Sequence, residues 1–322
     1  MFDRIGGVKM ISEMVSTQET YGKTLVELGD ENKDIFALEA DLMRCSGSKL
    51  FEDKYPDRHL QLGIAEQNLV GVAAGLAAMG RIPYVSTFAN FLTQRACDQI
   101  VMSLAYNKFN VKLVGSFAGI TSGNNGGTHI SVCDIAITRC IPNMKVMDPG
   151  DCNEFRHAII AASKDEGPTY IRQAKGPMKT IFDNTHKFEI GKGYKFGDGK
   201  DITLVSAGIT TSLAMDALAT LQKENIKARL IHLPTIKPAD SDLIIESAKA
   251  TGAILTIENH SVLGGLGGLV SEIVSKNYPV IIDSIGLKDT WGLNADIEFQ
   301  LKYFGFTVEN IVKKSKELIA KK

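Results

Sequence analysis

The sequence has 322 residues, of which 44% are hydrophobic and 23% are charged, a composition typical of soluble globular proteins with room for about two domains. Lysine and arginine number 36 against 37 aspartate and glutamate residues, so the formal net charge of -1 provides no basic face for nucleic acid or an anionic membrane. The most apolar window, residues 69–79, is much shorter than the roughly 20 residues that a membrane-spanning helix needs. We therefore expect no nucleic-acid partner and no membrane partner.

The cysteines and the first residues indicate the compartment. Five cysteines, an odd number without a C-x-x-C pair, fit reduced thiols better than a disulfide framework or a zinc site. The opening stretch, MFDRIGGVKMISEM, lacks the basic segment and apolar run of a secretion signal. We expect a soluble, unexported, cytoplasmic protein.

The first half of the sequence alternates between helical and strand-like segments, which is typical of a parallel α/β sheet with helices on both faces. Helical spacing is found at residues 20–32, 93–107 and 152–164, and in the apolar segment that starts at residue 66. Strand-like runs occupy residues 35–42, 59–64, 82–89, 111–119, 144–151 and 167–173.

A change in composition separates this series from a second one. Residues 174–201 are rich in Gly, Lys and polar residues, so we predict a linker there. Strands at 202–208, 227–234, 253–259 and 279–286 then alternate with helices at 210–224, 240–251 and 267–277, and a last helix lies near the C-terminus. We expect a first domain over residues 1–185, including the start of the linker, and a smaller α/β domain over residues 186–322.

Two glycine-rich tracts could suggest phosphate binding. The stretch GDGK at 197–200 leads into a strand rather than a helix, which predicts a turn. The stretch GGLGGLV at 264–270 precedes a helix but lacks the dinucleotide-binding spacing, so tight packing is the favoured interpretation.

The stretch GIAEQNLVGVAAG, residues 63–75, places Glu66 in the first turn of a helix without a charged residue before Arg81. The helix dipole alone favours a carboxylate there by about 0.3 to 1 kcal/mol. Because the rest of the helix has no polar face, we also predict that it is buried, and a buried carboxylate needs a partner. That partner is either a basic residue or a ligand with a proton to share.

Two other residues stand where chemistry is expected. His129 ends a loop of Gly and Asn residues, SGNNGGTHIS, which suits irregular backbone and presents side chains; a simple cap on the following helix is the alternative. Arg172 ends a predicted strand at the edge where parallel sheets bind anions, and an ordinary surface arginine is the alternative.

Several stretches, in chain order, resemble the pyrimidine-binding domain of transketolase and its thiamine diphosphate relatives: GIAEQNLVGVAAGLAAMGRIPYVSTFANFLTQRACDQI, GNNGGTH and RCIPNMKVMDPGD. The second half resembles the C-terminal domain of the same family through LPTIKPAD, IENHSVLGGLGGLVSEI and DTWGLNADIEFQLKYFGFT. The resemblance covers nearly the whole chain.

This resemblance implies a subunit of a split enzyme. Transketolases bind the diphosphate of their cofactor and its Mg²⁺ in an N-terminal domain, for which this sequence has no counterpart. We therefore expect a separate N-terminal subunit that binds Mg²⁺, two copies of each subunit, and active sites at their interfaces. This chain is expected to supply no metal ligand.

The resemblance also assigns cofactor-binding residues. Glu66 matches the glutamate that hydrogen-bonds a ring nitrogen of the cofactor's aminopyrimidine and favours its reactive imino tautomer. Its partner would then be a protonated cofactor nitrogen that no residue in this chain supplies. Phe88 and Phe91 match aromatic residues that pack around the aminopyrimidine, whereas the next aromatic of that series is replaced by Gln94.

Substrate-binding residues follow in the same way. His129 matches a histidine that contacts the donor sugar and the intermediate, and Arg172 matches an arginine near the phosphate end of the substrate. Asn125 replaces an aspartate that contacts a donor hydroxyl, and Phe117 replaces a histidine that binds phosphate. With Arg172 retained, we expect a ketose with an anionic end group, a phosphate or a sulfonate. The two replacements also leave a differently placed phosphate or a smaller aldehyde open.

The function implied is that of the C-terminal subunit of a two-subunit transketolase, which moves a two-carbon ketol unit from a ketose to an aldose. Two alternatives remain open on the sequence. One is a subunit of another thiamine diphosphate enzyme, of the deoxyxylulose-phosphate synthase or 2-oxoacid dehydrogenase beta type. The other is a non-catalytic partner subunit.

Overall fold

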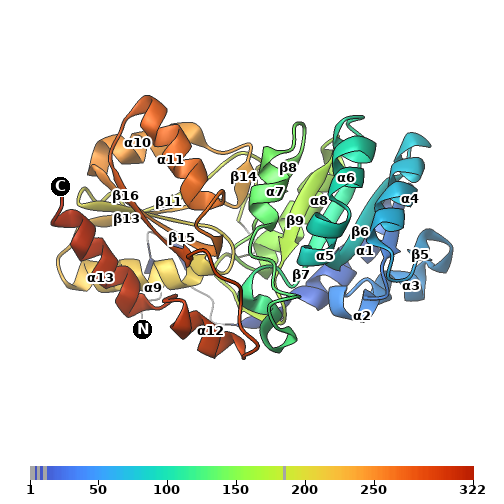
Figure 1. Ribbon diagram of the computed structural model, residues 1–322, viewed down its shortest axis with the longest axis horizontal. Helices are drawn as coiled ribbons and strands as arrows, with labels where there is room; N and C mark the ends of the chain where they lie inside the picture. Colours follow the sequence, from blue (N-terminus) through green and yellow to red (C-terminus); the bar gives the residue numbers. More distant parts are fainter. Residues whose placement is uncertain (1–3, 6–7, 10–12, 184–185) are drawn as a thin grey trace.

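In the computed structural model, which describes residues 4–5, 8–9, 13–183 and 186–322, two α/β domains lie side by side (Figure 1). The larger sheet has the order β14-β8-β9-β7-β6-β4-β5 within the described residues. Its strands are β4 (Ile35–Glu39), β5 (His59–Gln61), β6 (Ile82–Phe88), β7 (Lys112–Ser116), β8 (Lys145–Met147) and β9 (Thr169–Gln173), all parallel, and β14 (Thr235–Lys237), which is antiparallel.

Helices cover both faces of this sheet. They are α1 (Thr17–Glu31), α2 (Met43–Ser46), α3 (Lys49–Lys54), α4 (Glu66–Ala78), α5 (Ala89–Arg95), α6 (Cys97–Gln99), α7 (Asp134–Cys140) and α8 (Cys152–Lys164), with the 3-10 helices η1 (Pro56–Arg58) and η3 (Ile120–Asn125) and the π-helix η2 (Ile100–Ala105). On one face Tyr21 of α1 and Phe155 of α8 belong to one buried cluster. On the other face Leu69 of α4 and Leu92 of α5 belong to another.

The second domain has a smaller sheet of order β11-β13-β12-β15-β16 within the described residues. Its elements are β11 (Tyr194–Phe196), β12 (Ile202–Ser206), β13 (Ala228–His232), β15 (Ala253–Ser261), β16 (Ile281–Leu287), α9 (Thr210–Lys223), α10 (Ser241–Thr251), α11 (Leu266–Asn277), α12 (Ile297–Tyr303) and α13 (Val308–Ile319). Two short antiparallel ribbons complete the chain: β1 (Arg4–Ile5) with β2 (Val8–Lys9), and β3 (Met14–Ser16) with β10 (Pro177–Lys179).

The expected α/β architecture, a parallel sheet with helices on both faces followed by a smaller α/β domain, is confirmed. One strand crosses between the domains, because β14 follows β13 in sequence but pairs with β8 of the larger sheet. The buried cluster on the α4 face likewise continues into the second domain through Ile231 and Leu266. The expected boundary at residues 185 and 186 stays a prediction.

The expectation that the Glu66 helix is buried on every side is wrong. Leu69, Val70 and Ala73 are buried, but Gln67, Asn68, Gly71 and Gly75 form an exposed face. The sequence misled because this face lacks charged residues, but its glycine, glutamine and asparagine residues have little apolar area, so leaving it in water costs little.

Candidate active site

Glu66 lies at the start of α4, just beyond the carboxyl end of β5. Only 5% of its side chain is exposed, and its Oε1 accepts a hydrogen bond from Nη1 of Arg95 at 3.0 Å. A basic residue of this chain therefore pairs with the carboxylate, which is one of the two kinds of partner that the sequence left open. The contact with a cofactor nitrogen stays a prediction. Within the described residues Oε2 accepts no hydrogen bond, so one carboxylate oxygen remains available for a ligand.

The sequence did not predict the contact between Arg95 and Glu66, because the helix that contains Arg95 was expected to begin at Thr93. In the structure α5 begins at Ala89, so Phe91 and Arg95 lie one turn apart on the same helix. The Arg95 guanidinium lies over the Phe91 ring, 3.9 Å from its centroid. Arg95 therefore connects Glu66 to Phe91. An arginine four residues after an aromatic was the signal that could have revealed this contact.

Four rings form what we call the aromatic cluster: Phe88, Phe91, Phe117 and His129. The Phe88 ring stacks on Phe117 with centroids 4.7 Å apart and meets Phe91 at 5.7 Å. The His129 ring stands edge-on to Phe91 at 5.0 Å and to Phe88 at 5.9 Å. The structure thus brings together three of the predicted site residues, which come from β6, α5 and a loop.

His129 does not cap the following helix. The first residue of α7 is Asp134, preceded by Cys133 as its N-cap without a side-chain hydrogen bond. Instead, Nδ1 of His129 lies 2.9 Å from Oγ1 of Thr128. Asn125, on the same loop, is half-buried at the end of η3, and its side chain makes no hydrogen bond to the described part of the chain.

An open cleft lies beside the aromatic cluster, with a volume of about 600 Å³. Its lining combines residues of α5, the His129 loop and the second domain: Asn90, Phe91, Gln94, Arg95, Gly127, Thr128 and Trp291. Gln94 therefore stands on the wall of the cleft, and its Nε2 donates to Sγ of Cys133 at 3.4 Å. The contribution of Trp291 from the second domain had no signal in the sequence.

Phe117 and Lys175 extend the cluster at the carboxyl edge of the sheet. Phe117 follows β7 with φ at 58°, a left-handed conformation that is rare for a bulky residue. Nζ of Lys175, two residues beyond β9, lies 5.1 Å from the Phe117 centroid and donates to the Ser122 carbonyl at 3.2 Å. An ammonium group therefore lies beside the aromatic cluster.

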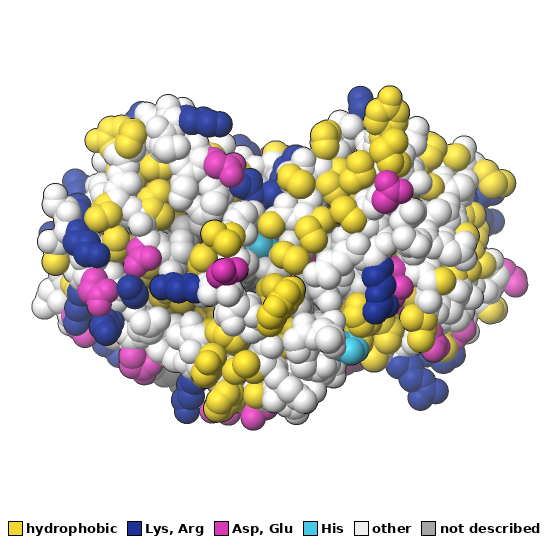
Figure 2. Space-filling view, in the orientation of Figure 1, with side chains coloured by type: hydrophobic (Ala, Val, Ile, Leu, Met, Phe, Trp, Pro, Cys, Tyr) yellow, Lys and Arg dark blue, Asp and Glu magenta, His cyan; other side chains and the backbone are white. Residues whose placement is uncertain are grey.

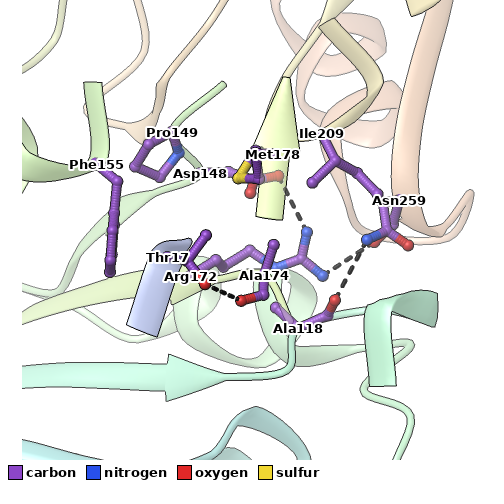
Figure 3. A pocket seen from close by; sticks show the side chains of 10 residues that line it. All are labelled: Thr17, Ala118, Asp148, Pro149, Phe155, Arg172, Ala174, Met178, Ile209 and Asn259. Atoms are coloured by element: carbon purple, nitrogen blue, oxygen red, sulfur yellow. Dashed lines mark hydrogen bonds and ion pairs between the residues drawn. The ribbon is translucent and has the colours of Figure 1, made fainter. Parts of the chain in front are cut away.

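Arg172 does not line this cleft. It lies beside a separate small cavity, together with Asp148 and Asn259 (Figure 3). It is 3% exposed, and its guanidinium is held by Asp134 at 2.7 and 3.1 Å, by Asp148 at 3.0 Å and by the Asn259 carbonyl at 2.9 Å. The cavity beside it measures about 10 Å³, room for about one water molecule at most. Its predicted contact with substrate stays a prediction, and its observed contacts join the two domains.

The carboxylates around Arg172 respond differently to burial. Burial acts to raise the pKa of Asp134, but the Arg172 guanidinium, together with His260 and the Tyr170 hydroxyl, holds that pKa below its ordinary value. Burial raises the pKa of Asp148 despite the same guanidinium. The contact with Asp134 is bidentate, whereas Asp148 accepts from a single nitrogen of the guanidinium.

Neither glycine-rich tract forms a phosphate site. GDGK leads directly into β12 and lies against the carbonyls of Lys227 and Ala228. The first amides of α11, those of Leu266 and Gly267, donate to the buried Glu258 carboxylate at 2.6 and 2.9 Å. Within the described residues no group of three or more His, Cys, Asp or Glu side chains could hold a metal ion.

Family comparisons agree with this arrangement. Residues 13–179 match the pyrimidine-binding domain of transketolase, and residues 191–311 match the transketolase C-terminal domain. In the part of the chain that the structure describes, no helix is both long and apolar enough to span a membrane.

Relatives are similar over nearly their full length. The chain is 39% identical to a 6-deoxy-6-sulfo-D-fructose transketolase subunit of Clostridium sp. over 305 residues, 95% of each chain. It is 33% identical to an apulose-4-phosphate transketolase subunit of Phocaeicola vulgatus over 313 residues, 97% of this chain and 100% of the relative.

A solved structure of a split-gene transketolase, in an inactive beta4 tetramer, has the same fold. It superposes with a TM-score of 0.87 at 39% identity, covering 96% of this chain and 99% of the other. None of these matches favours the other thiamine diphosphate enzymes. With both domains matched in order and full-length relatives that are transketolase subunits, the chain belongs to the transketolase family, as the C-terminal subunit of a two-subunit transketolase.

Proposed function

We propose that Glu66, Phe88 and Phe91 hold the aminopyrimidine of thiamine diphosphate, while a partner subunit binds its diphosphate and Mg²⁺. The observation that carries this proposal is the Oε2 atom of Glu66, which has no partner in the described residues and can accept a hydrogen bond from a ligand. Arg95, which contacts both Glu66 and Phe91, links this carboxylate to the aromatic cluster. These residues fit a flat ring with a basic nitrogen: the rings offer apolar faces, and the carboxylate offers a hydrogen-bond acceptor. Thiamine diphosphate, when bound, supplies the carbanion chemistry of ketol transfer.

His129 and Asn125 are the proposed contacts for the donor sugar. His129 is partly exposed and packs edge-on against Phe91, so its ring is fixed next to the aminopyrimidine site. A neutral imidazole can both donate to and accept from hydroxyl groups. Asn125 offers an amide without a partner in the described chain, which suits a sugar hydroxyl.

The sugar is proposed to carry an anionic end group. Two relatives act on anionic sugars by name, one a sulfonate and one a phosphate. Four of the five Arg172 N–H donors are used inside the chain, and the side chain is buried. We therefore assign the first contact with the anion to Lys175, whose ammonium uses one backbone acceptor and retains further donors. Arg172 supports the end of β9, from which Lys175 follows by two residues.

The N-terminal partner is proposed to dock on the exposed face of α4, in assemblies with two copies of each subunit. The relatives named above are subunits, and the solved split-gene transketolase is inactive as a beta4 tetramer, which supports dependence on another chain. All five cysteines are free, which supports a reducing compartment such as the cytoplasm.

Replacing Glu66 with Gln tests the proposal. In the complex reconstituted with the N-terminal subunit, Glu66→Gln should lower turnover by roughly 100-fold or more, because a neutral amide holds the aminopyrimidine nitrogen without the charge that favours its reactive tautomer. Steady-state transfer of a ketol unit to an aldose measures the loss, and circular-dichroism melting checks that the fold is intact.

Glu19 provides a matched control, since it also lies in the first turn of a helix but is exposed and paired only with Lys23. Glu19→Gln should leave turnover unchanged. The wild-type chain without its partner should catalyse nothing. Near-normal turnover in Glu66→Gln, or robust activity of the isolated chain, would contradict the proposal.

A further inference from the structure

Arg95 is placed unusually for a half-exposed arginine. Half of its side chain is exposed, yet its guanidinium makes two directional contacts at the candidate site. One edge donates to Oε1 of Glu66, and one face covers the Phe91 ring. A planar guanidinium can do both at once, whereas an ammonium group has no flat face to stack.

The two carboxylate oxygens of Glu66 are used unequally. Oε1 accepts from Arg95, while Oε2 has no partner in the described part of the chain. A charge-assisted hydrogen bond to one oxygen fixes the rotamer of the carboxylate and leaves the other oxygen free. Because the Phe91 ring also holds the guanidinium, Arg95 need not leave when a ligand binds Oε2.

The same guanidinium forms part of a cleft wall. Arg95 and Gln94 both line the 600 Å³ cleft, next to Phe91. At this wall the chain has an amide, Gln94, rather than an aromatic ring. The flat guanidinium stacked on Phe91 offers the planar surface that Gln94 does not.

We propose that Arg95 is a positioning residue of the cofactor site. It stays bound to Oε1 of Glu66 while Oε2 accepts from the aminopyrimidine, and it forms the wall of the pocket beside Phe91. This inference rests on the proposed function, since it requires that Glu66 bind the aminopyrimidine.

The test uses the complex with the N-terminal subunit in Mg²⁺, with thiamine diphosphate affinity measured by titration calorimetry. Arg95→Met should weaken binding by roughly 10-fold or more, as expected for loss of a charge-assisted hydrogen bond that orients a ligand group. Arg95→Lys should recover part of the affinity through charge alone. The KM of the sugar should change little in both variants.

Arg81 gives a matched control in the same domain. It pairs with Asp34, lies over the Phe36 ring at 6.0 Å, and is 43% exposed, so it makes the same two kinds of contact away from the cleft. Arg81→Met should leave cofactor affinity unchanged. The melting curve of Arg81→Met should match the wild type, because its ion pair with Asp34 is exposed and such pairs contribute little to stability. The melting curve of Arg95→Met verifies that the complex is folded at the temperature of the titration.

A double substitution separates positioning from a general effect. In a Glu66→Ala background, Arg95→Met should have less effect on cofactor affinity than it has alone, because the contact through which Arg95 acts is gone. Fully additive effects would overturn the proposal. Cofactor binding as tight as wild type, or tighter, in Arg95→Met would also overturn it, since Arg95 would then be a competitor that the cofactor displaces.

The two hypotheses fail in different ways. If Glu66 does not serve the cofactor, Glu66→Gln retains its turnover. If only the Arg95 assignment is wrong, Glu66→Gln loses turnover while Arg95→Met binds the cofactor normally.

Discussion

Phe117 adopts a strained backbone conformation next to a cation. A φ of 58° is unfavourable for a bulky side chain, so the surrounding structure must hold it in place. Its ring stacks on Phe88 on one side and faces the Lys175 ammonium on the other. The strained conformation places the Phe117 ring between Phe88 and the Lys175 ammonium. Within the described residues this is the only ammonium group over a ring of the aromatic cluster.

Replacing Lys175 with Met should weaken binding of anionic donors selectively. In the reconstituted complex, the KM for a ketose phosphate or sulfonate should rise by roughly 10-fold or more, as for loss of one charge-assisted contact. The KM for a neutral ketose and the kcat should change little, because the reacting end of the sugar lies elsewhere. Inhibition by inorganic sulfate should weaken in parallel.

Lys179 is a suitable control, because it is also partly exposed and lies four residues further on, but pairs with Asp216. Lys179→Met should leave both KM values at the wild-type level. If Lys175→Met raises the KM of neutral and anionic ketoses equally, the substitution distorts the site, and the assignment of Lys175 to the anion is wrong.

At the residue scale, the sequence anticipated which aromatic residues converge better than it anticipated the contacts of the arginines. Phe88, Phe91 and His129 converge because each follows a strand or loop whose position is fixed by the parallel sheet. The position of Arg95 relative to Phe91 depends on where helix α5 begins, and sequence patterns locate the ends of helices poorly. Arg172 was expected near substrate, but two aspartates on other elements hold it in the interior, and no local pattern in the sequence contains their positions.

Strand β4 ends in a buried carboxyl group. Glu39, its last residue, is fully buried, and its Oε1 accepts hydrogen bonds from Ser46 and Ser48 after the chain turns back. Its Oε2 has no partner in the described residues. Burial raises the pKa of Glu39 to about 8, with the two serine hydroxyls and nearby backbone amides opposing the shift only in part.

This carboxyl should make the free energy of unfolding depend on pH. Between its ordinary value and about 8, native Glu39 keeps a proton that the unfolded chain has lost, so stability is full below pH 4.5 and declines as pH rises toward 8. Glu39→Gln, which is always neutral, should remove that contribution, roughly 1 kcal/mol or more between pH 6 and pH 8. Urea unfolding at the two pH values measures the difference.

Glu258 contributes a slope of the same sign, because burial raises its pKa to about 7, and it is present in both proteins. The comparison of wild type with Glu39→Gln therefore cancels it. An identical pH slope in the two proteins would contradict the assignment of a protonated Glu39 in the native state.

At the element scale, hydrophobic periodicity predicted the parallel strands and most helices, including α8 at its observed bounds. It could not predict β14, because this short strand forms only by pairing with β8 of the other domain. It also could not show that the uncharged face of α4 is exposed. Both the pairing of β14 and the exposure of α4 depend on which distant segments pack together, and local sequence patterns do not encode this.

The whole molecule is held together by polar and apolar contacts between its domains. The buried cluster on the α4 face runs from Leu69 into the second domain, and Arg172 ties the two domains through Asp134 and the Asn259 carbonyl. The face shown in Figure 2 carries hydrophobic side chains over α5, α6 and α12, and α12 exposes Phe299 and Tyr303. The molecule thus combines a buried core that is continuous across both domains with exposed aromatic side chains on α12.

The exposed glycines of α4 should be needed for assembly rather than for folding. An added Cβ at Gly71 or Gly75 meets no atom within 4 Å, although glycine inside a helix costs about 0.5 to 1 kcal/mol relative to alanine. Gly71→Leu should therefore leave the isolated subunit at least as stable, yet block assembly with the N-terminal subunit, because the side chain fills the space that close packing needs. Sedimentation of the mixed subunits measures assembly, and Ser275→Leu, on the exposed face of α11, should assemble normally. Normal assembly of Gly71→Leu would place the partner elsewhere.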